Sequence, residues 1–364
     1  MQSNRIIVAS AGSGKTSRII EEVADAPDVR CAAVTYTTNN RSEIVAKAIG
    51  SLGYIPPNLT IDTWYAFLMK HFIRPYQRCF VDKRIMRLKF VNTQSALYIP
   101  EARIVQHYFD QNGQIYIDKV SKFACAVIKK TDGAPLARFQ KIFGRLYIDE
   151  CQDLAAYDLN LVEALLASDV EVVLVGDHRQ ATYSTNNAQK NKAFRRAAVI
   201  DKFNEWHKVG LCGIEFQNVS HRCIQSICDF ADLLNPDLPV TKSLNETVTD
   251  HDGVFAVRIG NVDEYMHHFA PQTLRYNRAQ RAVLGRPINY GEAKGMTFER
   301  TLIYPHGPLM KYLSTGNLKD AGKEIPKIYV AITRARQSAA FVVPNNFVSD
   351  QIAIWNAAAH INGL

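Results

Sequence analysis

Short apolar, β-branched runs recur along the chain, and segments with the apolar spacing of helices separate several of them. The runs lie at residues 6–8, 32–35, 146–148, 172–175, 301–304 and 340–343. Continuous apolar runs of this length are typical of strands that are buried on both faces of a parallel sheet. Their alternation with helical segments therefore predicts an α/β fold with mostly parallel sheets.

Two segments interrupt this alternation. Residues 70–145 have a helical pattern and are rich in aromatic and basic residues, whereas residues 239–287 contain one short strand candidate at residues 254–259. We expect both segments to be insertions into a plan of two α/β cores. The expected boundaries are 1–69 and 146–212 for the first core, 70–145 for a helical accessory insertion, 213–238 and 288–364 for the second core, and 239–287 for a reduced accessory insertion.

Composition narrows the class of protein. The chain has 364 residues, of which 47% are hydrophobic, and this is enough for two or three globular domains. No stretch approaches the roughly 20 apolar residues of a membrane helix, and no apolar signal-peptide core follows the start, so we expect neither a membrane span nor secretion. The seven cysteines form no CxxC pair, which argues against a zinc module or a disulfide framework and favours the cytoplasm. The net charge of +8 favours a polyanionic partner such as nucleic acid.

A phosphate-binding loop is predicted near the start of the chain. Residues 9–16 read ASAGSGKT and follow the first strand candidate, so they match GxxxxGK[ST] except at the first glycine. In such a loop, backbone N–H groups turn toward the phosphates, Lys15 reaches the β- and γ-oxygens, and the Thr16 hydroxyl ligates Mg²⁺. The predicted nucleotide contacts in the loop are Ala11, Gly12, Ser13, Gly14, Lys15 and Thr16.

A strand that ends in adjacent carboxylates supplies the complementary chemistry. Residues 146–153 read LYIDECQD. Asp149 is placed to hold Mg²⁺, and Glu150 is placed to orient and deprotonate the attacking water. An acidic turn at the start of a helix is the alternative interpretation of this segment. The phosphate-binding loop makes hydrolysis the better one.

Six further motifs follow in a fixed order. They are AVTYTTN at 33–39, TIDTWY at 60–65, VVLVGDHRQ at 172–180, NVSHR at 218–222, GEAKGMTF at 291–298 and YVAITRAR at 329–336. Together with the loop and the acidic segment, this set resembles the UvrD/Rep branch of superfamily 1 helicases. The resemblance extends from residue 9 to residue 336 and implies two RecA-like P-loop NTPase cores.

The resemblance also implies roles for residues in both cores. ATP would lie between the cores, with Arg222 and Arg334 as charge-stabilising fingers on the γ-phosphate and Gln180 positioning the hydrolytic water. His221 and Gly295 would contact the nucleotide. His221 stands where the family has a tyrosine that stacks on adenine, and the family's upstream glutamine motif is missing, so the base preference stays open.

Nucleic-acid contacts are implied by the same motifs. Tyr36 occupies the family's base-stacking position, Thr63 and Trp64 occupy the next phosphate and aromatic positions, and Tyr183 follows the third motif. A basic stretch at residues 70–90, with seven basic residues, one acid and interleaved aromatics, suits a surface that tracks a nucleic-acid backbone. A solvated helix face would show a similar pattern.

Three functions remain open at this stage. The leading hypothesis is an ATP-dependent DNA helicase or single-strand DNA translocase, with 3′-to-5′ direction implied by the family. The principal alternative is an ATP-gated regulatory or assembly subunit of a nuclease-containing phage-defence or DNA-repair complex, with DNA-stimulated hydrolysis and little unwinding. A non-catalytic nucleic-acid-binding module is the third, and the presence of Glu150, Arg222 and Arg334 argues against it.

Overall fold

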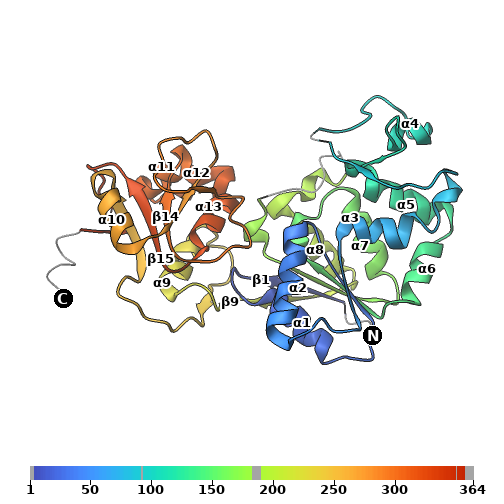
Figure 1. Ribbon diagram of the computed structural model, residues 1–364, viewed down its shortest axis with the longest axis horizontal. Helices are drawn as coiled ribbons and strands as arrows, with labels where there is room; N and C mark the ends of the chain where they lie inside the picture. The colour runs from blue at the N-terminus through green and yellow to red at the C-terminus, as the bar shows by residue number, and fades with distance from the viewer. Residues whose placement is uncertain (1–3, 92, 183–189, 350, 357–364) are drawn as a thin grey trace. The chain divides into compact units, whose positions relative to one another are not determined.

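The computed structural model describes residues 4–91, 93–182, 190–349 and 351–356, which form two compact units (Figure 1). The first unit comprises Met1–Val8 and Lys15–Phe216, and the second comprises Ala9–Gly14 and Gln217–Leu364. Within these described ranges, no helix combines the length and the apolar character that a membrane crossing requires.

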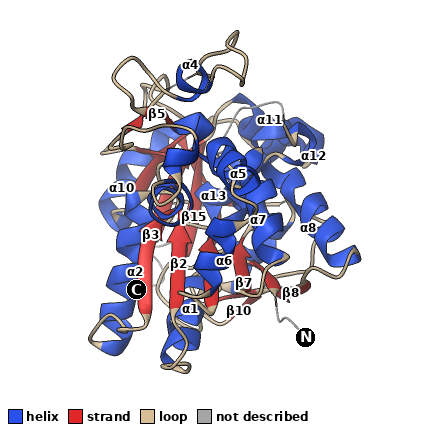
Figure 2. Cartoon of the chain, turned by 90° about the vertical axis from the view of Figure 1, so that its right-hand side faces the viewer, coloured by secondary structure: helices blue, strands red, loops and turns tan. Residues whose placement is uncertain are grey.

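A six-stranded sheet forms the centre of the first unit. In order across the sheet, its strands are β3 (Leu59–Thr63), β2 (Cys31–Thr35), β6 (Arg145–Asp149), β7 (Glu171–Gly176), β1 (Arg5–Ala9) and β8 (Gly213–Gln217). Neighbours from β3 to β1 pair in parallel, and β2 and β3 lie side by side in Figure 2. The apolar runs expected at residues 6–8, 32–35, 146–148 and 172–175 are confirmed as strands. Their side chains are almost fully buried because helices cover both faces.

Helices connect the strands of the first unit. They are α1 (Lys15–Ala24), α2 (Thr38–Leu52), α3 (Trp64–Leu68), α7 (Tyr157–Leu166) and α8 (Val199–Lys208). Helix α1 is amphipathic and buries Ile19, Ile20 and Val23. Helix α2 begins after Thr37, whose side chain accepts a hydrogen bond from the Asn40 N–H at 3.1 Å and so satisfies a free amide of the first turn.

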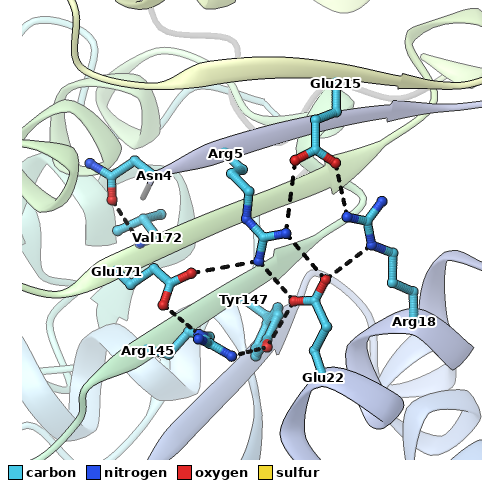
Figure 3. A network of polar contacts seen from close by, with 9 residues as sticks. All are labelled: Asn4, Arg5, Arg18, Glu22, Arg145, Tyr147, Glu171, Val172 and Glu215. Atoms are coloured by element: carbon cyan, nitrogen blue, oxygen red, sulfur yellow. Dashed lines mark hydrogen bonds and ion pairs between the residues drawn. The ribbon is translucent and has the colours of Figure 1, made fainter. Parts of the chain in front are cut away.

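A polar network fastens the amino ends of these strands to α1 (Figure 3). Arg5 at the start of β1 pairs with Glu22 of α1 at 2.9 Å and with Glu171 of β7 at 3.5 Å. Glu22 also pairs with Arg18 and accepts a hydrogen bond from the Tyr147 hydroxyl at 3.1 Å. Because α1 follows the phosphate-loop sequence directly, this network fixes the helix that carries Lys15 at its start.

The expected helical insertion at 70–145 contains helices and a small sheet. Its elements are β4 (Leu88–Lys89), α4 (Ile104–Tyr108), β5 (Ile115–Tyr116), α5 (Val120–Lys130) and α6 (Ala134–Gln140), preceded by a π-helix at Met69–Ile73. Strands β4 and β5 pair in parallel. In Figures 1 and 2, α4 and its flanking loops project from the body of the first unit.

The second unit is built on another six-stranded parallel sheet. Its strands, in order, are β13 (Ile288–Asn289), β12 (Gln272–Arg275), β14 (Phe298–Tyr304), β15 (Ala335–Val343), β11 (Gly253–Arg258) and β16 (Ala353–Ile354). A two-stranded pair joins β9 (Val219–Ser220) to β10 (Lys242–Ser243). Its helices are α9 (Gln225–Asp232), α10 (Val262–Phe269), α11 (Gly307–Thr315), α12 (Leu318–Ala321) and α13 (Ile325–Ile332).

This sheet corrects the expectation that residues 239–287 form an accessory insertion. Strand β11 lies between β15 and β16, and β12 pairs with β14, so the segment contributes two strands to the second core. Strand β12 is short and begins and ends with the polar residues Gln272 and Arg275, so it contains no continuous apolar run by which the sequence could predict it. The two parallel α/β cores themselves are as predicted.

Candidate functional site

The carboxyl edge of the first sheet gathers the predicted hydrolytic residues. Lys15 and Thr16 begin α1 after the loop that follows β1, Asp149 is the last residue of β6, and Gln180 lies in the short turn after β7. Parallel strands β1, β7 and β6 are neighbours, so these three segments leave the sheet at the same edge. Open parallel sheets bind ligands at this edge.

Burial and mutual repulsion shape the electrostatics of the carboxylate pair. Asp149 is 6% exposed, and its burial, followed by the charge of Glu150, raises its pKa to about 7, although Lys15 opposes the shift. The Glu150 amide donates to Asp149 Oδ1 at 2.9 Å. Glu150 has a φ of 57°, an unusual backbone conformation for a non-glycine residue at a site where charge is concentrated.

A network that the sequence did not reveal connects Glu150 to the segment that contains Gln180. The Gln152 side-chain amide donates to Glu150, and its carbonyl oxygen accepts from the Asp177 N–H at 3.1 Å. The fully buried Asp177 accepts from Gln180 Nε2 at 2.7 Å and pairs with Arg179 at 3.1 Å. Burial alone would raise the pKa of Asp177, but Arg179 and Lys15 outweigh it and hold the pKa below its usual value.

Gly176 makes this connection possible. A Cβ at this position would overlap the Gln152 side-chain oxygen and lie 2.7 Å from the Cys151 sulfur. Only glycine lets the end of β7 approach the acidic segment this closely. Gln152 and Asp177 therefore hold Glu150 and Gln180, the two groups that the motifs predict to act on the hydrolytic water.

The loop Ala9–Gly14 is packed within the second unit. Its carbonyl oxygens at Ala11 and Gly12 accept hydrogen bonds from the Ser220 hydroxyl at 2.8 Å and the His221 amide at 2.9 Å. Gly12 has a φ of 75°, and a Cβ there would lie 2.5 Å from the Cβ of Arg222. The predicted loop residues Ala11 and Gly12 thus contact the motif that contains His221 and Arg222.

The two predicted arginine fingers converge inside the second unit. Arg222 Nη1 donates to the Thr333 carbonyl oxygen at 3.1 Å, and Arg334 Nη2 donates to the Thr333 hydroxyl at 3.3 Å. Arg334 is 1% exposed and also donates to the carbonyl oxygens of Val330 and Met296. Met296 follows the predicted nucleotide contact Gly295, so three separate motifs meet at these arginines.

The predicted nucleic-acid residues differ in their exposure. Tyr36 and Thr63 follow or end neighbouring strands β2 and β3 and are partly exposed. Trp64 is 0% exposed and donates from Nε1 to a carboxylate oxygen of Asp158 at 2.8 Å. A fully buried ring offers no face to a base, so direct stacking on Trp64 is not supported. Tyr183 lies outside the described residues.

The basic stretch is exposed where it crosses the projecting part of the first unit. Lys83, Arg84, Arg87 and Lys89 are exposed, as are the apolar side chains of Met86 and Phe90 at 63% and 74%. Tyr98 on the following loop is 96% exposed. Exposed cations interleaved with exposed aromatic rings are the combination that single-stranded nucleic acid requires.

The residues at the carboxyl edge fit a nucleotide with Mg²⁺. No group of three or more His, Cys, Asp or Glu side chains that could hold a metal ion occurs among the described residues. Mg²⁺ in phosphoryl-transfer sites needs only one or two protein oxygens because phosphates and water complete its shell. Thr16 and Asp149 supply such a pair, and a cation there would relieve the repulsion between Asp149 and Glu150.

Two protein families match the chain. A family described as an AAA domain matches residues 1–186, and a family described as the viral superfamily 1 RNA helicase core domain matches residues 119–343. No curated protein sequence matches the chain.

Among solved structures, the chain is similar to Arterivirus nonstructural protein 10 (helicase). The complex of that protein with DNA is 16% identical, with a TM-score of 0.48, and the match covers 94% of this chain and 61% of that chain. The crystal structure of the same protein is 15% identical, with a TM-score of 0.46, covering 94% and 60%. The present chain thus spans less than two thirds of that helicase.

Proposed function

Because the chain belongs to the superfamily 1 helicases, in the family of the viral superfamily 1 RNA helicase core domain, we propose that it hydrolyses ATP to move along single-stranded DNA. The observation that carries the proposal is the meeting of Lys15, Asp149 and Gln180 at one edge of a parallel sheet. The direction of movement that we propose is 3′ to 5′.

The chain's residues divide the chemistry between them. Lys15 binds the β- and γ-phosphates, and Thr16 and Asp149 would hold Mg²⁺, which would neutralise charge on those phosphates. Glu150 accepts a proton from the attacking water, and Gln180 orients that water. Arg222 and Arg334 stabilise the charge that develops on the transferred phosphoryl group.

A second candidate function has one observation in its favour. Residues 239–287 contribute strands to the second sheet, so the described residues from 217 to 356 contain no separate accessory domain that could part a duplex. This favours a translocase with weak unwinding, or an ATP-gated subunit of a nuclease-containing defence or repair complex. Strand-displacement activity would exclude the gated subunit.

Steady-state ATP hydrolysis with and without single-stranded DNA tests the proposal, with Lys15→Ala as the blank. We expect strong stimulation by DNA and no hydrolysis by the variant, because the β/γ-phosphate cation is lost. A parallel assay with single-stranded RNA shows whether DNA or RNA stimulates hydrolysis more strongly. Hydrolysis that neither strand stimulates would contradict the motor and favour the gated subunit, and turnover by Lys15→Ala would overturn the site.

A further inference from the structure

One buried carboxylate connects four parts of the first unit. Asp158 is 1% exposed and is the second residue of α7. Its Oδ1 accepts hydrogen bonds from Trp64 Nε1 at 2.8 Å and from the Ser121 hydroxyl. Its Oδ2 accepts from the Tyr36 hydroxyl at 3.2 Å and lies 3.5 Å from the Ala155 backbone nitrogen.

These donors come from four different segments of the first unit. Tyr36 directly follows β2, Trp64 directly follows β3, and Ser121 belongs to α5 of the insertion. Ala155 lies in the connection between the acidic segment that contains Asp149 and helix α7. The four donors named here are electrically neutral, so they offer the carboxylate bond dipoles rather than an opposite charge.

The hydroxyl of Tyr36 is hydrogen-bonded to Asp158, while the residue as a whole stays partly exposed. Its ring centroid lies 6.2 Å from that of Trp64 and 6.3 Å from that of Tyr65, the latter edge-on. Burial, followed by the negative charge of Asp158, raises the pKa of Tyr36 well above its usual value, so the phenol stays protonated and donates. The carboxylate and two aromatic neighbours thus set the orientation of the ring.

We propose that Asp158 is a positioning residue for nucleic-acid binding. It holds Tyr36 in the orientation that stacking on a base requires, and it connects Tyr36 to the segment that follows Asp149 and Glu150. The inference rests on the proposed function, because it assigns Tyr36 to a base of the bound strand. Trp64 acts in this arrangement as a buried support for Tyr36 rather than as a platform.

Replacement of the carboxylate tests the inference. An asparagine in place of Asp158 would accept at one oxygen only, and its amide group would face donors. Binding is measured with a labelled oligothymidylate of about 16 nucleotides. In Asp158→Asn, we expect the half-saturating concentration of this oligonucleotide to rise at least about tenfold. The KM for ATP should change by less than about twofold, because the hydrogen bonds of Asp158 go to segments outside the phosphate-binding loop.

Variants that each remove one hydrogen bond to Asp158 keep the test valid if Asp158→Asn does not fold. Tyr36→Phe and Trp64→Phe each remove one donor to Asp158 and retain an aromatic ring, and each should raise the half-saturating oligonucleotide concentration about threefold. Val162→Ala is the matched control. It removes buried volume one turn along α7 without changing the carboxylate, and its oligonucleotide binding should match that of the wild type.

The outcomes separate the inference from the function on which it rests. A wild-type chain that does not bind the oligonucleotide would overturn both. The role of Asp158 alone would be overturned if the wild type binds the oligonucleotide and none of the three hydrogen-bond variants binds it more weakly than Val162→Ala does. An equal rise in the KM for ATP would likewise contradict a role specific to nucleic acid.

Discussion

At the scale of single residues, Arg334 of the second unit shows how a buried charged side chain is held in one orientation. Arg334 is buried, and its guanidinium donates to Val330, Met296 and Thr333. These bonds fix the planar group, which would leave little reorganisation for the phosphoryl transfer in which we propose that it acts.

Arg334→Ala should therefore lower kcat about a thousandfold while nucleotide binding stays nearly intact, as expected for an arginine that acts in the transition state. Single-turnover hydrolysis and nucleotide binding are the measurements. Arg336→Ala is the control, since this neighbouring arginine pairs with Glu299 at 3.2 Å and should retain nearly full turnover. An effect on KM alone would remove Arg334 from the role.

Residue types and motif positions predicted where the candidate site residues lie along the chain, but not how deeply each side chain is buried. Lys15, Asp149 and Gln180 could be assigned because their motifs have fixed positions relative to strands. Trp64 could not be distinguished from a surface platform, since an aromatic after a strand is common in both settings. Asp158 was missed because an acid in the first turn of a helix usually serves the helix itself, and its donors are distant in sequence.

At the scale of elements, ion pairs at the amino ends of the strands hold helix α1. Burial raises the pKa of Glu22, but hydrogen bonds from Arg5 and Arg18 outweigh that effect and leave the pKa below its usual value. The carboxylate is therefore ionised in the folded state over a wider range of acidity than in the unfolded chain. Its stabilising effect is present above its ordinary pKa and is lost as the pH falls.

Glu22→Gln should lower the free energy of unfolding by about 1–2 kcal/mol at neutral pH, because two guanidinium groups lose their shared anion. Urea denaturation of the two proteins measures the difference. Glu21→Gln provides the comparison, as its side chain is exposed on the same helix, and its effect should stay within about 0.5 kcal/mol. Equal effects of the two substitutions would argue against the network.

The π-helix of the insertion contains a buried histidine among aromatic rings. His71 is 5% exposed, packs against Phe67, Phe139 and Phe143, and has no hydrogen-bond partner at either ring nitrogen within the described structure. Burial, with the nearby charges of Lys70 and Arg138, lowers its pKa to about 4. The folded state therefore resists protonation that the unfolded chain accepts.

This histidine should make the first unit sensitive to acid. Between pH 7 and 5 the unfolded chain takes up a proton that folded His71 does not, so the free energy of unfolding should fall by about 2 kcal/mol from this group. His71→Phe should remove that part of the pH dependence in urea denaturation. His207→Gln, which changes an exposed histidine, should leave it in place. An unchanged slope in His71→Phe would contradict the assignment.

The elements that the sequence predicted are those with continuous apolar runs. Residues 6–8, 146–148 and 172–175 became buried strands because parallel sheets require apolar side chains on both faces. Strands β3 and β12 were missed since polar residues interrupt them at Asp62, Gln272 and Arg275. Because β12 was missed, residues 239–287 were expected to be an insertion, whereas they contribute β11 and β12 to the second sheet.

At the scale of the whole molecule, the order of eight motifs outweighed the weakness of each. Membership of superfamily 1 was predicted from that order and is confirmed, while the UvrD/Rep branch stays a prediction. Each of the two units contains a six-stranded sheet, as the predicted plan of two α/β cores requires. The 3′-to-5′ direction is proposed from the resemblance of the motifs and not from the architecture of either core.

The projecting part of the first unit should contribute to nucleic-acid binding through its charge. Replacement of Lys83, Arg84, Arg87 and Lys89 by alanine should reduce the slope of log binding constant against log salt by about 0.7 for each phosphate that is no longer neutralised. Oligothymidylate binding at several salt concentrations measures this slope. Alanine at the exposed Lys129 and Lys130 of α5 should leave it unchanged. Identical slopes for the two variants would exclude the basic stretch from the binding surface.

The packing of the loop Ala9–Gly14 within the second unit determines where the chain can be truncated without loss of nucleotide binding. A truncated protein that stops at residue 217 would retain the whole first sheet and Lys15, but its loop would lack Ser220 and His221, which donate to Ala11 and Gly12. Such a fragment should fold as a sheet and still bind nucleotide poorly. The shortest fragment that binds nucleotide well must therefore extend into sequence that encodes the second core.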